Sequence, residues 1–513
     1  MKAHKRGYTR AGGVLATISV ALLAATGCAG GGSSSPDSTA VATDGTIRAV
    51  ATAEPVTLNP VLIRDNSYRV AGAMFDGVVG TDDTGLPDDS GLATSWTSVD
   101  DTTWQFTLRD GVTFHDGTDF SAEDVAFTIA AIQENPKAPY ATFYKRIVSV
   151  ETPDDLTITV TTATPDSSIP ALFTTLRPVP SEYYEEVGAE GFESAPIGTG
   201  PYMFDSKQPG QSLTLTRYDD YWGGAGQVKT LEFTYSADAA ARVSLLQAGD
   251  VDVIYEAPSQ SASQLESSGA QVASGPVATT LVLFTRVPVD PSEQATEREA
   301  ASLAVDRDVL LEGVMKGNGE PQNRVITQSL TEAAEPEIAY DPDEATDLVA
   351  GTGPKIRLMY SSGAYEQDKA IGEAIAAMLT DVGFTVTQEI KTIAEMYEAE
   401  TLPASPDEAL MTLHPAQATY PDPDVQIGYY VLTLGLCGDP AAFQPLALEG
   451  LSSVDPAERA PAYEEMEDMM INQNHCMLPI AQMLGSFGVA DSVGGFQVPY
   501  VGTPDWTTVT VSE

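Results

Sequence analysis

The sequence predicts an α/β protein built from two or three lobes, and three observations lead to this fold class. At 513 residues the chain exceeds what one hydrophobic core usually supports. Short runs alternate apolar and polar residues, as Trp104, Phe106 and Leu108 do, which is typical of half-buried strands. Residues 356–386 contain a strand, a helix with one apolar face and a second strand. Such a β-α-β unit predicts a mixed sheet flanked by helices.

The first 43 residues carry signals for export. Four basic side chains lie within residues 1–10, and a run of small apolar residues follows over residues 11–25. The run Ala-Thr-Gly-Cys that ends at Cys28 resembles a bacterial lipobox. We therefore expect a lipoprotein signal peptide over residues 1–27, a lipidated Cys28 and a flexible tether over residues 28–43. An ordinary cleavable signal is the alternative, and no later segment is apolar for long enough to span a bilayer.

The charge balance bears on the class of partner. The formal net charge is −47 at pH 7, from 26 basic and 73 acidic side chains, which argues against nucleic acid as a partner. Most of these carboxylates are expected to be solvated at the surface, although acidity could also mark a cationic ligand.

The elements after the leader can be predicted in chain order from their periodicity. The strand that starts at Trp104 leads through turns at Asp110-Gly111 and Asp116-Gly117 to a helix in which Ser121 and Asp124 form a capping-box pattern. The later elements are a strand over 156–160, a helix over 239–249, a strand over 251–254, a helix whose start carries the capping-box pattern Thr296/Glu299, a strand over 356–360, a helix over 368–382, a strand that begins over 384–386, and a helix over 455–470 with Asp455 as its cap.

The literal residues of these segments resemble one known family. Residues 108–117 (LRDGVTFHDG) and 122–125 (AEDV) are similar to the signature of the extracellular solute-binding proteins, family 5, of peptide and nickel ABC importers. Residues 196–202 (PIGTGPY), 218–224 (YDDYWGG) and 420–424 (YPDPD) fit the same family. The resemblance implies a two-lobe periplasmic-binding-protein fold of the large three-segment type, with mixed sheets, a hinge and an interlobe cleft. His115, inside the signature, is expected to be structural.

The resemblance also implies a division of the chain. Lobe I would comprise residues 44–78, 196–283 and 485–513, with an inserted subdomain over 79–195, and lobe II would comprise 284–484. The chain would cross between the lobes near Phe284 and return near Leu484. Residues 54–60 (EPVTLNP) resemble the strand that opens the first lobe.

The same resemblance implies a ligand site in the cleft. The residues expected there are Arg64, Asp65, Asn66, Phe284, Arg286, His414, Thr419, Tyr420, Asp422 and Tyr429. Peptide-binding members generally carry an Asp three residues before the Asp-Pro pair and a Trp three residues earlier, where this chain has Thr419 and Ala416. A hydroxyl cannot offer an ammonium the charge-assisted bond that a carboxylate offers. Asp422 or Asp65 could take over that role.

Because Thr419 replaces the expected Asp, several classes of ligand remain possible. An oligopeptide or similar small solute is the first expectation. A metal chelate bound through Arg64, Arg286 and His414 is an alternative, and a sugar would need aromatic platforms such as Tyr420 or Tyr429.

Enzyme chemistry is not expected. The sequence contains no GxSxG and no HExxH, and three widely spaced histidines after the leader do not predict a metal site or another cofactor. It also contains no P-loop, so the ATPases of the importer would be separate chains. We expect a monomer at the outer face of the membrane that serves a permease. A sensory or pheromone receptor on the same fold and a secreted hydrolase are the rival classes.

Cys437 and Cys476 are the two cysteines that remain once Cys28 is lipidated. An exported chain permits a disulfide between them, and two buried free thiols are the alternative.

Overall fold

The computed structural model describes residues 44–63, 67–288, 290–405 and 407–512. The leader, Cys28, the tether and the predicted contacts Arg64, Asp65 and Asn66 lie outside the described residues. The described part of the chain contains no helix that is both long and apolar enough to cross a membrane.

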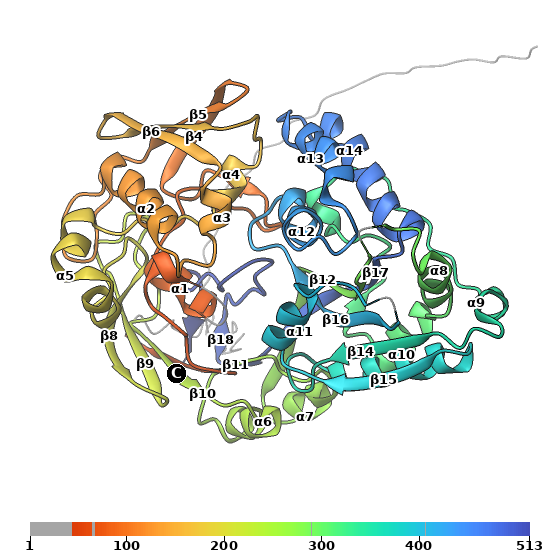
Figure 1. Cartoon of the computed structure of the whole chain (residues 1–513). Coiled ribbons are helices and arrows are strands. Elements are labelled where there is room, and N and C mark those ends of the chain that lie inside the picture. The colour runs from red at the N-terminus through yellow and green to blue at the C-terminus, as the bar shows by residue number, and fades with distance from the viewer. Residues whose placement is uncertain (1–43, 64–66, 289, 406, 513) are drawn as a thin grey trace, which may run out of the picture. The chain divides into compact units, whose positions relative to one another are not determined.

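One large mixed sheet runs through most of the protein (Figure 1). Its strands lie side by side in the order β15 (Thr385–Ile390), β14 (Lys355–Tyr360), β16 (Ala409–Gln417), β12 (Ala270–Thr285), β17 (Met477–Ala490), β11 (Val253–Tyr255), β1 (Thr46–Ala51), β10 (Thr230–Tyr235), β9 (Ser212–Arg217) and β8 (Tyr202–Gln208), and β13 (Gly319–Glu320) pairs with β17. β14 lies parallel to β15, and α10 (Asp368–Asp381) connects them. This confirms the predicted β-α-β unit and the α/β class.

The strands β12 and β17 are the longest, with 16 and 14 residues. They pair with each other in antiparallel fashion from Ala270 to Phe284, with register shifts between Pro276 and Thr280 and between Leu281 and Val282. β12 pairs with β16 through its later half, and β17 pairs with β11 near its end. The two strands therefore connect the part of the sheet around β1 with the part around β14.

A second sheet has four strands in the order β4 (Ala93–Asp100), β5 (Thr103–Leu108), β7 (Thr157–Thr162) and β6 (Ile147–Asp154). Helix α2 (Ala122–Glu134) packs against β6 and β7, and the predicted capping box of Ser121 and Asp124 is present at its start. Between sheet and helices, the ring of Phe106 stacks on Phe173 with 4.7 Å between the centroids. All four strands fall within the segment predicted as an insert (Figure 1).

The described residues form further helices of four or more residues. They are α1 (Tyr68–Met74), α3 (Ala141–Tyr144), α4 (Ile169–Leu172), α5 (Ser181–Ser194), α6 (Ala239–Ala248), α7 (Ala262–Glu266), α8 (Ala295–Leu303), α9 (Pro342–Val349), α11 (Ile393–Glu400), α12 (Pro423–Gly428), α13 (Gln444–Leu451) and α14 (Pro456–Asp468), with π-helical turns η4 (Val309–Met315), η6 (Tyr429–Thr433) and η8 (Met469–Gln473). Asp455 caps α14 as predicted.

Two local predictions are wrong. Residues 54–60 form no strand, and the strand that opens the sheet is β1, which ends at Ala51. Prolines at 55 and 60 lack the N–H that a ladder requires, and Asn59 instead caps a short 3₁₀ turn. The second error concerns α8, which begins at Ala295 after Gln294 rather than with a Thr296/Glu299 capping box.

The family signature around His115 contacts the later Gly198-Thr199-Gly200 stretch directly. The backbone N–H of His115 donates to Gly198 O at 2.9 Å, the N–H of Gly198 donates to His115 Nδ1 at 3.2 Å, and His115 Nε2 lies 3.0 Å from Gly200 O. Burial lowers the pKa of His115 to about 4. The imidazole is therefore neutral near pH 7, and its contacts are structural.

Asp76 follows α1 and is tied to the segment around Trp222. Its carboxylate accepts hydrogen bonds from Tyr221 OH and from Trp222 Nε1, each at 2.9 Å. Burial raises the pKa of Asp76 to about 6, although these hydrogen bonds oppose the shift.

A pH dependence of stability follows from Asp76. Because its pKa is higher in the folded protein than in the unfolded chain, its contribution is complete below about pH 3.8 and is lost as pH rises through about 6. Relative to D76N, the wild type should lose about 2 kcal/mol of unfolding free energy between pH 4 and pH 7. Urea titrations of both proteins across this range measure the difference. D89N, at an exposed aspartate, is the control, and a wild-type-minus-D76N difference that stays constant with pH would contradict the assignment.

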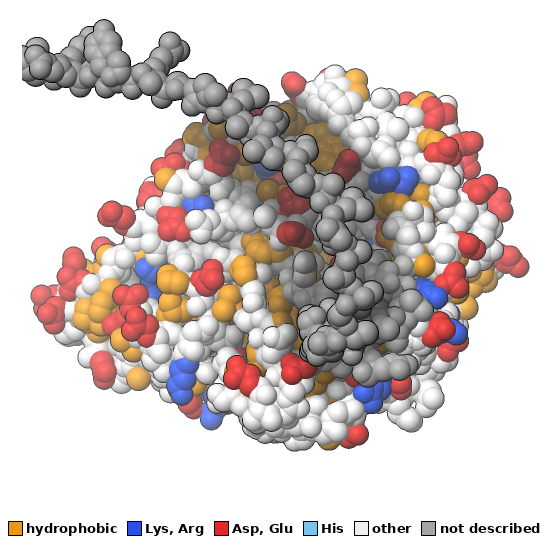
Figure 2. Space-filling view, turned by 180° about the vertical axis from the view of Figure 1, so that it is seen from behind, with side chains coloured by type: hydrophobic (Ala, Val, Ile, Leu, Met, Phe, Trp, Pro, Cys, Tyr) orange, Lys and Arg blue, Asp and Glu red, His pale blue; other side chains and the backbone are white. Residues whose placement is uncertain are grey.

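The surface agrees with a solvated acidic shell on the face that Figure 2 shows. Acidic side chains are scattered across that face among fewer basic ones.

Candidate functional site

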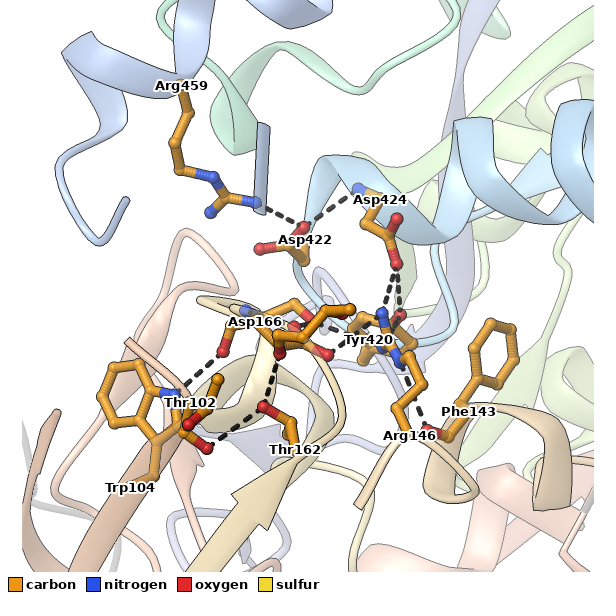
Figure 3. A network of polar contacts seen from close by, with 12 residues as sticks. Thr102, Trp104, Phe143, Arg146, Thr162, Asp166, Tyr420, Asp422, Asp424 and Arg459 are labelled. Carbon is orange, nitrogen blue, oxygen red and sulfur yellow. Dashed lines mark hydrogen bonds and ion pairs between the residues drawn. The ribbon is translucent and has the colours of Figure 1, made fainter. Parts of the chain in front are cut away.

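Arg146 joins segments that lie far apart in the sequence (Figure 3). Its Nη1 donates to Asp424 Oδ2 at 2.9 Å, and its Nη2 donates to Tyr420 OH at 2.9 Å. The same guanidinium lies 3.3 Å from Asp166 Oδ2. We call Arg146, Asp166, Tyr420 and Asp424 the Arg146 network. It connects the four-stranded-sheet region to the segment after β16.

Local structure explains how each member is placed. Arg146 stands between α3 and β6, and Asp424 lies in the first turn of α12. Asp422 caps α12 by accepting from the N–H of Asp424, and it also accepts from Arg459 Nη2 at 2.8 Å. The ring of Phe143 meets Tyr420 edge to face at 5.4 Å. Asp424 is therefore held in position by its own segment, independently of Arg146.

The electrostatics of the network keep Arg146 charged. Burial by itself would lower the pKa of Arg146, but Tyr420, Asp166 and Asp424 outweigh burial and raise it. Burial raises the pKa of Asp166, and Arg146 opposes that shift. Asp166 and Asp424 are only 2% and 9% exposed.

A second group of side chains surrounds the buried carboxylate of Glu400, at the end of α11. His414 Nε2 lies 2.7 Å from Glu400 Oε1, and the hydroxyl of Thr412 donates to the same oxygen. Phe284 stacks on the His414 ring at 4.4 Å and Tyr397 meets it edge-on at 4.9 Å. We call Phe284, Tyr397, Glu400, His414, Tyr429 and Tyr430 the Glu400 cluster, because the two remaining tyrosines pack on Tyr397 and Phe284.

Tyr140, from another part of the chain, lies near this cluster, and Tyr68 packs against Tyr140. The rings of Tyr68 and Tyr140 are 6.1 Å apart. Burial raises the pKa of Tyr397 to about 12, and Tyr140 adds to the shift together with Glu400 and Tyr429, which places Tyr140 near Tyr397. Burial also lowers the pKa of Arg177, which interacts electrostatically with Tyr68.

These side chains are partly buried but keep some exposure to solvent. Tyr68, Tyr140, Arg177 and Tyr397 are each only partly buried. Arg177 Nε has no hydrogen-bond partner among the described residues, and its Nη1 donates to Thr175 O at 3.4 Å. A guanidinium with spare donors can bind a carboxylate. The arrangement therefore offers aromatic surface and an anion-binding group.

The structure brings together most of the predicted ligand contacts that it describes. Phe284, His414 and Tyr429 belong to the Glu400 cluster, and Tyr420 and Asp422 lie in or beside the Arg146 network. Arg286 donates to Leu434 O and Gly435 O, each at 2.7 Å, and interacts electrostatically with Glu400.

Thr419 is the residue that the family resemblance predicts to stand in place of an Asp. Its side chain is partly buried, and Oγ1 has no hydrogen-bond partner among the described residues.

Several residues at the site were missed by sequence reasoning. Tyr68, Tyr140, Arg146 and Arg177 stand in no motif that marks them. Glu400 did carry a signal, because it continues the helical spacing of Ile393, Met396 and Tyr397, where an apolar residue is the rule. A charged residue at such a position indicates a buried carboxylate that needs partners.

Cys437 and Cys476 form a disulfide with 5.3 Å between their Cα atoms. Within the described ranges no three His, Cys, Asp or Glu side chains gather as a metal site would require.

Known proteins resemble this chain in sequence and in fold. The model of the bacterial extracellular solute-binding proteins, family 5, middle part, matches residues 89–434. A protein of Escherichia coli strain K12 named probable D,D-dipeptide-binding periplasmic protein is 26% identical over 447 residues, which are 82% of this chain and 85% of that protein.

Two solved structures share the fold. The dipeptide-binding protein of a Pseudoalteromonas species, in complex with Met-Leu, superposes with a TM-score of 0.78 at 20% identity, over 91% of this chain and all of that one. A binding protein from Agrobacterium tumefaciens in complex with agropinic acid gives a TM-score of 0.76 at 22% identity, over 91% of this chain and 99% of that one.

Proposed function

Because the chain belongs to the bacterial extracellular solute-binding proteins of family 5, we propose that it captures an oligopeptide or similar small solute between its two lobes and delivers it to an ABC permease. Family membership and fold make it a two-lobe solute-binding protein of ABC transport. The ligand, the anchor and the division into lobes belong to the proposal.

The observation that carries the proposal is the meeting of partly buried aromatic and charged groups from two parts of the chain. Tyr68, Tyr140 and Arg177 come from one part, and Tyr397 and Tyr429 from the other. Binding sites of this kind are mostly apolar, with a few polar groups that fix the orientation of the ligand. Ligand contacts from both sides would exist only when the lobes are closed, so binding would favour closure.

The lobes would move about β12 and β17. We take lobe I as residues 44–78, 196–283 and 485–513, its insert as 79–195, and lobe II as 284–484. Both proposed crossings, near Phe284 and Leu484, lie in these strands, and the irregular pairing between Pro276 and Thr280 supports a bending point there.

A peptide is the preferred ligand. Arg177 is suited to a terminal carboxylate, and a relative is named for D,D-dipeptide binding. A metal chelate or another non-peptide solute is the second candidate, favoured by Thr419 in place of an acid and by a neighbour solved with agropinic acid. Lipidation of Cys28 would hold the protein at the outer face of the membrane, where a monomer could meet the permease.

The ligand can be identified by native mass spectrometry of the exported chain, purified without denaturant and then denatured to release what it holds. A series of short peptides is the expected result. A single non-peptide mass or a metal would overturn the peptide assignment while keeping solute capture. If the protein is empty, calorimetry with Met-Leu as the probe decides, and absent binding would contradict dipeptide capture.

The position of the site can be tested with one substitution. Tyr397→Ala should weaken binding of the identified solute, or of Met-Leu, by about tenfold, because a buried aromatic contact is lost. Tyr340→Ala is the matched control, since Tyr340 is 51% exposed. Equal affinities of wild type and Y397A, measured by calorimetry, would place the ligand elsewhere.

A further inference from the structure

We propose that Arg146 is a latch that holds the two lobes closed, and that it populates the closed form even without ligand. The inference rests on the proposed function only in assuming that the lobes open and close. It assigns a closure-determining role to a residue outside the set of expected ligand contacts.

The contacts of Arg146 divide into two sets. Its Nε donates to Phe143 O at 3.3 Å, its Nη2 donates to Ser168 Oγ at 3.2 Å, and Asp166 completes the local set (Figure 3). These partners belong to the same insert and would stay with Arg146 in an open form. The bonds to Asp424 and Tyr420 reach lobe II and can exist only when the lobes meet.

The lobe II side of the latch is preformed. Tyr420 OH donates to Asp424 Oδ2 at 3.2 Å, and Asp422 fixes the start of α12 while paired with Arg459. Because the acceptor is already oriented, the bond to Arg146 forms at little cost in side-chain entropy.

The closed form needs the positive charge of Arg146. Closure brings Asp424 beside Asp166, and among the described residues Arg146 is the only cationic side chain paired with either carboxylate. Without the guanidinium, the closed form would hold two neighbouring carboxylates with little access to water. Removing one partner of a buried ion pair is strongly unfavourable, because the remaining charge stays unpaired.

The latch is mechanically connected to the proposed ligand site. Residues 140–146 are one short segment around α3, with Tyr140 toward the Glu400 cluster at one end and Arg146 at the other. Between them Phe143 packs on Tyr420. A ligand that holds Tyr140 against Tyr397 would also hold Arg146 against Asp424. Ser167, also in the insert, donates its N–H to Leu451 O at 2.9 Å and adds one interlobe bond beside the latch.

The test measures the distance between the insert and lobe II directly. Val148, in the insert, and Val454, in the proposed lobe II, are each 62% exposed. The exported chain carries C28S, which removes the cysteine at position 28. V148C and V454C then provide the only free thiols for a pair of dyes or spin labels, because Cys437 and Cys476 are bonded to each other. Single-molecule energy transfer on ligand-free protein then gives the fractions of molecules in which the two labels are close together (closed) and far apart (open).

The latch predicts a pattern across variants. R146Q should lower the ratio of short-distance to long-distance molecules by about tenfold, and D424N should lower it less. The double variant R146Q/D424N should recover part of the loss, because Asp424 no longer needs a cation. R357Q is the control, since Arg357 lies 4.0 Å from Glu408 within the same lobe.

Three outcomes would overturn the proposal. They are a wild type that shows only the long distance, an R146Q distribution equal to that of the wild type, and an R146Q effect of undiminished size in the D424N background. Circular dichroism of each variant separates a shift in closure from misfolding. No ligand is used, so failure of peptide binding would count against the proposed function and leave this result unaffected.

Discussion

Changing Cys437 and Cys476 together to Ala is expected to lower the free energy of unfolding by about 4 kcal/mol, because a cross-link over such a loop restricts the unfolded chain. The two residues are separated by 39 positions. The bond also ties the loop after Tyr430 to the start of β17, where Cys476 O accepts from the N–H of Thr285 at the end of β12. Urea denaturation of the oxidised wild type and the double variant measures the difference.

Reduction provides the control for the disulfide. The wild type treated with a reducing agent should lose a similar amount of stability, and the double-Ala variant should not respond. The substitution itself introduces no unpaired polar group, because both cysteines are buried and Ala is apolar. A variant that unfolds at the same urea concentration as the oxidised wild type would show that the cross-link contributes nothing.

Replacing Gly198 by Ala is expected to lower the free energy of unfolding by about 3 kcal/mol, because a side chain there has no room. An added Cβ would overlap the carbonyl oxygen of Met74 and the ring of Phe75. The backbone cannot retreat easily, since Gly198 exchanges hydrogen bonds with His115 and the N–H of Gly200 donates to Met74 O at 2.9 Å.

Gly313→Ala is the matched control for this substitution. The nearest atom to a Cβ at Gly313 is 4.0 Å away, so the change should be neutral or slightly stabilising. Thermal and urea unfolding of G198A, G313A and the wild type test the contrast. If G198A and G313A have equal stabilities, the close approach at Gly198 is not a constraint on the fold.

Local patterns predicted much of the fold. The capping box of Ser121 and Asp124, the cap at Asp455 and the β-α-β unit involve residues a few positions apart or one strand and one helix, whose geometry follows from backbone periodicity. The signature around His115 and the Gly198-Thr199-Gly200 stretch were recognised separately. The two stretches contact each other in the fold. One provides the imidazole of His115, and the other provides the backbone that approaches it closely.

Long-range pairing limited the prediction of the site. Arg146 and Asp424 are 278 positions apart, and only packing of the whole chain decides that they meet. The helical pattern of α11 could have indicated that Glu400 is buried. It could not have indicated the partner His414, which comes from β16. The strand β1 ends just before the family-like stretch 54–60, so the resemblance marks the loop and not the strand itself.

The position of β17 has a consequence for the order of synthesis. This strand, residues 477–490, lies in the middle of the large sheet between β12 and β11. Until a ribosome has made about 490 residues, the two halves of the sheet have no strand between them, and their pairing cannot be completed. A nascent chain therefore remains incompletely folded for nearly the whole of its translation.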